Sequence, residues 1–193
     1  MQEYGYPGIV GVITHDVGTS SKIPLAGMEE MRDAGWDMAS HPQFHQSYRE
    51  MTEAVMRERI RDSKEWLVEN GFERGAEHLI WPFNAYGEAS LRVASRYHKL
   101  GFALSEAPSG RLSDPMVVGR VDGTDLESTK RAIELADEYD ETLTIMYHDV
   151  GEGSKLSRDS FVDTLDAIEA SGLEVTTATG LWESASASVG SID

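Results

Sequence analysis

Residues 35–45 have the sequence GWDMASHPQFH, and this stretch decides the fold of the chain. Its glycine is typical of the position just past a helix end, and residues 36–40 predict a short strand. His41 and His45 follow that strand, and Pro42 favours a helical first turn between them because it fixes φ there. Neutral imidazole is a common metal ligand. The spacing alone therefore leaves two interpretations open: a metal site, or two polar loop residues beside a proline.

Predicted strands and helices alternate on both sides of this stretch. Apolar, β-branched runs predict strands at 8–14, 36–40, 78–81, 102–104, 116–121, 142–147 and 174–177. Amphipathic patterns predict helices at 24–34, 52–70, 88–100, 126–139 and 158–171, with a further helical turn at 179–185. Glycines separate a helix from a strand at Gly35, Gly71, Gly101 and Gly172. This alternation implies parallel strands joined by helical crossovers, and seven strands are enough to curl towards a barrel.

The length and composition indicate a single globular domain. A chain of 193 residues with 40% hydrophobic residues can bury a sizeable core. We expect residues 1–193 to form one domain whose Ser/Ala-rich tail, 184–193, is frayed. The absence of cysteine excludes disulfides, thiolate zinc sites and a cysteine nucleophile.

The chain is strongly acidic. It has 34 Asp and Glu against 17 Lys and Arg, which gives a formal net charge of −17. Such a surface repels phosphates, so we expect neither nucleic acid nor anionic lipid as a partner. The charge favours a halophilic protein adapted to high salt over an ordinary acidic cytosolic protein. No apolar run approaches the ~20 residues of a membrane span, and no signal peptide is recognised at the N-terminus, which predicts a cytoplasmic location.

Polar side chains gather where the predicted strands end. The segments that follow strand ends are His15-Asp16, 41–45, 81–84 and His148-Asp149. In parallel α/β folds functional groups collect at these ends. Two imidazoles and a carboxylate would hold a divalent ion with an open position for water, and a further histidine would protonate a leaving amine. The pattern predicts a metal hydrolase, with His78 and His98 interpreted as structural.

These motifs resemble those of the NodB-type polysaccharide deacetylases, carbohydrate esterase family 4. Residues 33–45, DAGWDMASHPQFH, are similar to the family segment DAGHEIGSH-[TS]-x-x-H, in which the two histidines bind the metal. Weaker similarities occur at residues 4–10 (YGYPGIV), 81–84 (WPFN), 145–148 (IMYH) and 158–183. The resemblance spans nearly the whole chain.

The resemblance implies a fold, a reaction and a set of site residues. The fold would be α/β, a distorted and partly open (β/α)7–8 barrel. The reaction would be metal-dependent removal of N-acetyl groups from amino sugars of a glycan. His41 and His45 would bind a divalent metal, most simply Zn²⁺, with Co²⁺ as an alternative. His148 would be the general acid and the peptide N–H of Phe83 the oxyanion donor. The carbohydrate substrate would contact Trp81, Pro82, Asn84 and Tyr147.

The sequence also departs from the family pattern. The Thr-Phe-Asp-Asp strand that supplies a ligand and a base has no counterpart before Tyr4, so we expect a missing first strand, impaired catalysis and an exposed sheet edge that allows oligomers. Asp16 is a candidate substitute ligand. No arginine precedes Pro82, and Asn84 replaces a glycine. Two alternatives remain open: a non-catalytic carbohydrate-binding module, or another metal amidohydrolase acting on small amides or purine-type rings.

Overall fold

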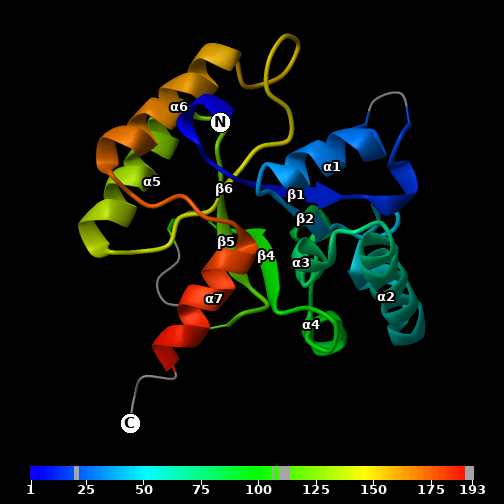
Figure 1. The fold of residues 1–193 in the computed structure, drawn as a ribbon. Helices are drawn as coiled ribbons and strands as arrows, with labels where there is room; N and C mark the ends of the chain where they lie inside the picture. The colour runs from blue at the N-terminus through cyan, green and yellow to red at the C-terminus, as the bar shows by residue number, and fades with distance from the viewer. Residues whose placement is uncertain (20–21, 106, 109–113, 190–193) are drawn as a thin grey trace. The chain divides into compact units, whose positions relative to one another are not determined.

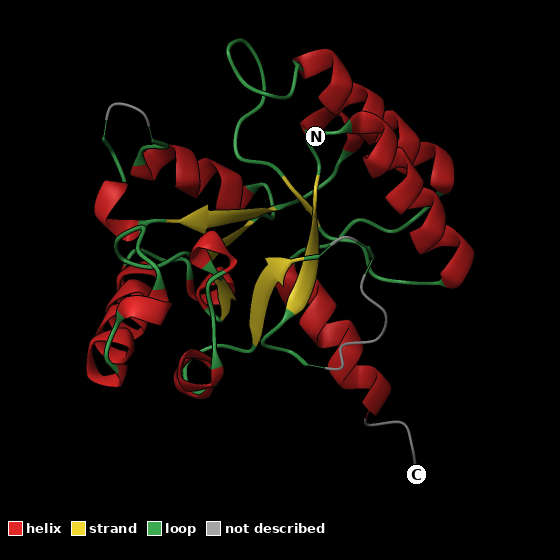
Figure 2. Ribbon diagram, turned by 180° about the vertical axis from the view of Figure 1, so that it is seen from behind, coloured by secondary structure: helices red, strands yellow, loops and turns green. Residues whose placement is uncertain are grey.

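Strands and helices alternate along the chain (Figures 1 and 2). The computed structural model describes residues 1–19, 22–105, 107–108 and 114–189. Their contacts divide the chain into two compact units. The larger unit comprises 7–102, 115–117 and 176–193, and the smaller unit comprises 1–6, 103–114 and 118–175.

The larger unit is built on four parallel strands. Its elements are β1 (Ile9–Val12), α1 (Leu25–Asp33), β2 (Asp37–Ser40), α2 (Glu53–Glu69), α3 (Glu73–Ala76), β3 (His78–Ile80), α4 (Glu88–Ala94), β4 (Leu100–Leu104) and α7 (Ala178–Val189). Neighbouring strands pair in parallel, with Val12 opposite Ser40, Ser40 opposite Leu79 and Leu79 opposite Gly101. β4 reaches the smaller unit with its last two residues. These pairings confirm the predicted α/β class with helical crossovers.

A continuous apolar core joins the strands and helices of this unit. Its buried members are Val12, Met28, Met38, Leu67, Phe72 and Ala76. They come from β1, α1, β2, α2, the connection before α3 and α3 itself. The core therefore holds β2 in place, and residues 41–45, called the histidine loop below, follow the carboxyl end of this strand.

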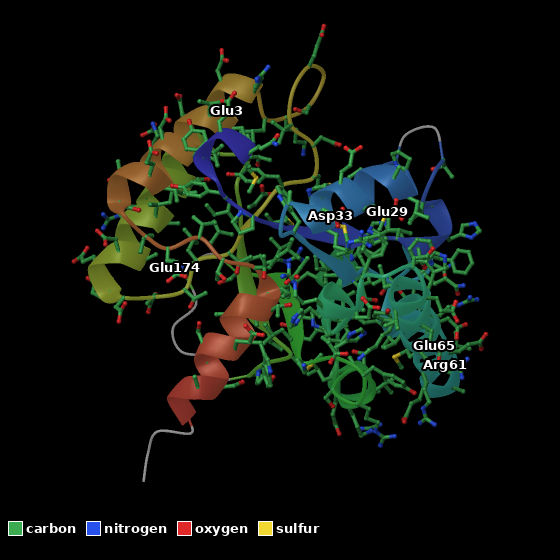
Figure 3. The ribbon with its side chains drawn as sticks, in the orientation of Figure 1. Glu3, Glu29, Asp33, Arg61, Glu65 and Glu174 are labelled. Carbon is green, nitrogen blue, oxygen red and sulfur yellow. The ribbon has the colours of Figure 1, made fainter. Side chains whose placement is uncertain are left out.

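Helix α2 follows from its sequence pattern. The Thr52 hydroxyl caps its start by accepting a hydrogen bond from Val55 N (3.4 Å). Its buried residues are Met56, Ile60, Ser63 and Leu67, which recur at helical spacing on one face. On the solvent side Arg61 and Glu65 lie side by side one turn apart (Figure 3), with Arg61 Nε 3.6 Å from Glu65 Oε1.

The smaller unit contains two parallel strands and two helices that lie side by side (Figures 1 and 2). Its elements are β5 (Val118–Asp122), α5 (Leu126–Tyr139), β6 (Ile145–Met146) and α6 (Arg158–Ser171). The end of β4, then β5 and β6 are neighbours in chain order. Asp125 and Ser157 cap the two helices by accepting hydrogen bonds from Ser128 N (2.7 Å) and Ser160 N (3.0 Å).

Three predictions about the elements are wrong. The described residues form six strands instead of seven, because residues 174–177 are not a strand: Thr177 Oγ1 instead accepts a hydrogen bond from Gly180 N (3.3 Å) at the start of α7. Helix α4 ends at Ala94 instead of continuing to Leu100, which pairs with His78 in the sheet. Gly101 accordingly lies inside β4, where an added Cβ would stand 2.5 Å from Met116 O.

The C-terminal segment is more helical than predicted. Residues 184–189, expected to fray, belong to α7, and residues 190–193 lie outside the described part of the chain. None of the helices in that described part is both long enough and apolar enough to cross a membrane.

Candidate metal and substrate site

His41 is held from both neighbouring strands at the carboxyl end of β2. Its backbone N–H donates to Val12 O (3.0 Å), and its ring Nδ1 lies 2.8 Å from Ile80 O. A carbonyl only accepts, so Nδ1 donates the proton of this contact, and in the neutral form of the imidazole the lone pair is on Nε2. A backbone carbonyl that orients a histidine in this way is a common feature of metal-binding histidines.

The structure brings the predicted histidine pair together. The ring centroids of His41 and His45 are 5.1 Å apart, and the rings are inclined by 53°. Two imidazoles that bind one tetrahedral ion through bonds of about 2 Å have ring centres about 5 Å apart. The separation of the two ring centres alone matches that of two imidazoles on one ion.

The turn after β3 places an aromatic ring beside this pair. Phe83 is 62% exposed, and its ring centroid lies 4.2 Å from that of His45. Phe83 and Asn84 both have φ of 53°, in the left-handed region. Asparagine tolerates this conformation better than most residues, so the turn keeps a glycine-like backbone although Asn84 stands where the family pattern has glycine.

Trp81 and Pro82 support this turn from the core. Trp81 is 1% exposed and its indole N–H donates to Met116 O (2.7 Å). Its ring also makes an edge contact with Tyr48, with centroids 5.9 Å apart, and Pro82 is buried. Neither side chain offers a surface to a substrate in this arrangement. Both anchor the start of the turn that carries Phe83.

His148 and Tyr147 lie in the smaller unit. His148 is exposed just after β6, at a strand end as the sequence predicted. The Tyr147 ring meets that of Phe161 on α6 edge to face, at 5.1 Å and 88°. Burial raises the pKa of the Tyr147 hydroxyl, so this group stays protonated at neutral pH.

Two further histidines, His78 and His98, have structural surroundings, in agreement with their interpretation from sequence. His78 is 1% exposed with Nε2 3.2 Å from Thr179 Oγ1, and His98 is 5% exposed with Nδ1 3.1 Å from Ala76 O. Burial lowers the pKa of His78 to about 4 and that of His98 to about 3. Both side chains are therefore neutral at pH 7.

No carboxylate completes the pair among the residues that the structure describes. Within them, no three or more His, Cys, Asp or Glu side chains form a group that could hold a metal ion. Asp16, the candidate substitute ligand, therefore does not join His41 and His45. The described donor set is two imidazoles, which suits a divalent ion but provides no negative charge.

Sequence reasoning missed one residue at the histidine loop. Arg59 of α2 donates from Nη1 to Gln43 Oε1 (2.5 Å), and its guanidinium carbon lies 4.6 Å from the Phe44 ring centroid. In the sequence Arg59 is one of several arginines spaced along an exposed helix, so no sequence signal distinguished it.

Comparisons with known proteins bear out the resemblance to the polysaccharide deacetylases. The polysaccharide deacetylase family model matches residues 1–103. A search among curated proteins found no match.

Solved structures show the fold. A Streptococcus pyogenes deacetylase, PplD, has 22% identity and a TM-score of 0.58 over 62% of this chain and 54% of its own. A family 4 carbohydrate esterase from Streptomyces lividans has 10% identity and a TM-score of 0.61 over 90% and 80%.

A third neighbour is the Xyl-CE4 domain of a multidomain xylanase from the hindgut metagenome of Trinervitermes trinervoides. It has 15% identity and a TM-score of 0.60 over 95% of this chain and 80% of its own. The chain thus spans about half of PplD, at 54%, and 80% each of the S. lividans esterase and the Xyl-CE4 domain. These likenesses confirm the predicted fold class, a partial NodB-type (β/α) barrel.

Proposed function

Because the chain belongs to the polysaccharide deacetylase family, we propose that it is part of a carbohydrate deacetylase that removes N-acetyl groups from amino sugars of a glycan. The observation that carries the proposal is the histidine pair. His41 is fixed in one tautomer by Ile80 O, and its ring lies 5.1 Å from that of His45. The exposed Phe83 lies directly against His45. The PplD and S. lividans structures contain acetate, the product that this reaction would release.

His41 and His45 would hold a divalent ion, with Zn²⁺ as the first choice because imidazole nitrogen suits it. When bound, the ion would polarise the amide carbonyl and lower the pKa of a water molecule. The described donors are neutral, so we expect weak binding by this chain alone.

The other site residues would act around the scissile amide. The Phe83 peptide N–H would donate to the oxyanion, and His148 would protonate the leaving amine. Asn84 and Tyr147 would contact the sugar, whereas Trp81 and Pro82 would set the turn. Exposed aromatic rings such as that of Phe83 suit the apolar faces of sugar rings.

Two alanine variants separate the ligand role from the acid role. His41→Ala should weaken Zn²⁺ binding in isothermal titration by more than about 100-fold, the upper range found when only an outer partner of a ligand is lost. His148→Ala should leave Zn²⁺ affinity unchanged but lower acetate release from N-acetylglucosamine oligomers by about 10²–10⁴-fold. Equal Zn²⁺ affinity in wild type and His41→Ala would rule out the proposed ligand.

A non-catalytic carbohydrate-binding role is the second candidate. The absence of a three-residue metal group among the described residues favours it. In that case N-acetylglucosamine oligomers would bind equally well with and without Zn²⁺ or Co²⁺, and no acetate would be released with either ion. Metal-dependent acetate release would exclude this role.

A further inference from the structure

Arg59 and the histidine loop make two contacts at the middle of HPQFH. The guanidinium Nη1 donates to the side-chain oxygen of Gln43 (2.5 Å). The same guanidinium lies over the Phe44 ring, 4.6 Å from its centroid, within the range of a cation–π interaction. Arg59 of helix α2 thus contacts both residues that separate Pro42 from His45, namely Gln43 and Phe44.

The opposite side of the loop rests on the segment after β1. The His15 and Phe44 ring centroids are 4.4 Å apart, and His15 N donates to Gln43 O (3.1 Å). Phe44 therefore has an imidazole and a guanidinium as neighbours, from two elements distant in sequence. Because His41 is already fixed by Val12 O and Ile80 O, these contacts determine where the chain emerges at His45.

Arg59 differs from the arginines beside it on α2. Arg57 pairs with Glu53, and Arg61 pairs with Asp62 and Glu65. Arg59 forms no ion pair of this kind with a described residue, and its Nε is buried without a hydrogen-bond partner. A buried donor without a partner is destabilising. The contacts of the guanidinium with Gln43 and Phe44 offset this cost.

We propose that Arg59 is a positioning residue that orients the histidine loop so that His41 and His45 face one divalent ion. The inference rests on the proposed function, because it assumes that the pair binds an ion. The guanidinium acts through its contacts with Gln43 and Phe44. The guanidinium N–H donor holds the side-chain oxygen of Gln43, and the planar face of the guanidinium packs on the Phe44 ring.

The test compares three single variants of the full chain. Arg59→Met keeps the length of the apolar stem but removes the donors and the charge. Arg59→Lys keeps the charge without the planar fork, and Arg61→Met is the matched control on the same helix. We expect Co²⁺ affinity to fall about 10- to 100-fold in Arg59→Met, to recover partly in Arg59→Lys, and to stay at the wild-type value in Arg61→Met.

Two further measurements distinguish positioning from general loss of structure. The absorption spectrum of bound Co²⁺ should change shape in Arg59→Met, because the ligand geometry changes, while the metal-free melting temperature stays near that of Arg61→Met. Combining Arg59→Met with Gln43→Ala should weaken Co²⁺ affinity less than the sum of the two single effects, since the two residues share one contact.

A metal-free readout decides the inference even if the proposed function fails. The imidazole NMR signals of His41 and His45 should shift in Arg59→Met, while those of the buried His78 stay in place. If the wild-type chain binds no Co²⁺, the proposed function falls, and the imidazole signals alone decide the role of Arg59. Unchanged signals and unchanged Co²⁺ affinity in Arg59→Met would overturn the inference.

Discussion

At the scale of single residues, the turn after β3 contains the most unusual backbone of the site. Phe83 and Asn84 are consecutive, and both have φ of 53°. The left-handed conformation costs an ordinary L-residue about 1–2 kcal/mol. Such outliers persist where surrounding structure holds them, and they cluster at functional sites. Here the buried Trp81 and Pro82 hold the turn, and the result is an exposed ring against His45.

The Asn84 backbone can be tested with a pair of variants that both lack the amide side chain. Asn84→Ala should unfold more easily than Asn84→Gly by about 1 kcal/mol, because only alanine has a Cβ that opposes positive φ. Urea denaturation of the two variants measures the difference directly. Equal unfolding free energies would mean that the left-handed backbone at residue 84 carries no strain.

At the scale of elements, one buried carboxylate ties α7 to the amino end of β2. Asp37 is 1% exposed, and its two oxygens accept from Thr179 N and from Arg74 Nε, each at 2.8 Å. Burial alone would raise the pKa of Asp37, but hydrogen bonds from Thr179, Thr177 and Arg74 lower it on balance. A residue at 37 therefore anchors a helix that starts 141 positions later.

Asp37→Asn should weaken the attachment of α7 to β2. The variant loses the ion pair with Arg74, which keeps its hydrogen bond to Gly35 O (2.7 Å), and weakens the hydrogen bonds that the carboxylate accepts, so we expect a loss of about 2–3 kcal/mol in unfolding free energy. Hydrogen exchange at the amides of α7 should become faster. Asp33→Asn is the matched control, because Asp33 is 69% exposed where it pairs with Arg32.

The pH dependence of this effect has a definite sign. The pKa of Asp37 is lower in the folded chain than its ordinary value, so the carboxylate contributes stability above the unfolded pKa of about 3.9. That contribution disappears as the pH falls through the folded pKa. Wild type and Asp37→Asn should therefore converge in stability at low pH. If the difference in unfolding free energy between wild type and Asp37→Asn stays constant down to the lowest pH, the Asp37 carboxylate does not stabilise the fold in this way.

The sequence predicted helix bounds correctly where capping residues next to the helix determine them. Helices α5 and α6 have the predicted bounds, because each starts at a side-chain cap and ends in a left-handed residue, Asp140 or Gly172. The predictions failed where long-range pairing decides. Leu100 joins the sheet beside His78, and residues 174–177 lead into α7 instead of pairing.

Within the candidate site, too, one part could be predicted from the sequence and another could not. The spacing of His41 and His45 after a strand was visible in sequence, and the structure brings the two rings together. The role of Arg59 could not be predicted from the sequence, because its partners Gln43 and Phe44 lie outside α2. The same helix also carries Arg57 and Arg61 nearby. Only the fold shows which of these arginines faces the loop.

At the scale of the whole molecule, the dominant property is excess negative charge. Even if each of the 17 basic residues paired with one acid, half of the 34 acidic residues would have no basic partner. The acids labelled in Figure 3 come from several elements in both units, among them Glu3, Glu29 and Glu174. Exposed ion pairs contribute only about 0–1 kcal/mol each, so pairing cannot offset the mutual repulsion.

Salt should therefore stabilise this chain by screening. The Debye length falls from about 10 Å at 0.1 M to about 3 Å at 1 M, which removes repulsion between all but neighbouring exposed charges. The unfolded chain is more expanded and carries a weaker repulsion, so screening favours the folded state. Thermal melts in increasing KCl should show a rising midpoint. A flat or falling midpoint would remove the argument for a protein adapted to high salt.

A charge variant separates screening from other effects of KCl. Replacing the exposed Glu3, Glu30 and Glu174 with lysine turns three negative charges into positive ones. If repulsion is the cause, the triple variant should melt at a higher temperature than wild type in low KCl, and the two should converge in molar KCl. If KCl acts through ion exclusion or hydration instead, both proteins will gain the same number of degrees at every concentration, and net charge will have no part in the response.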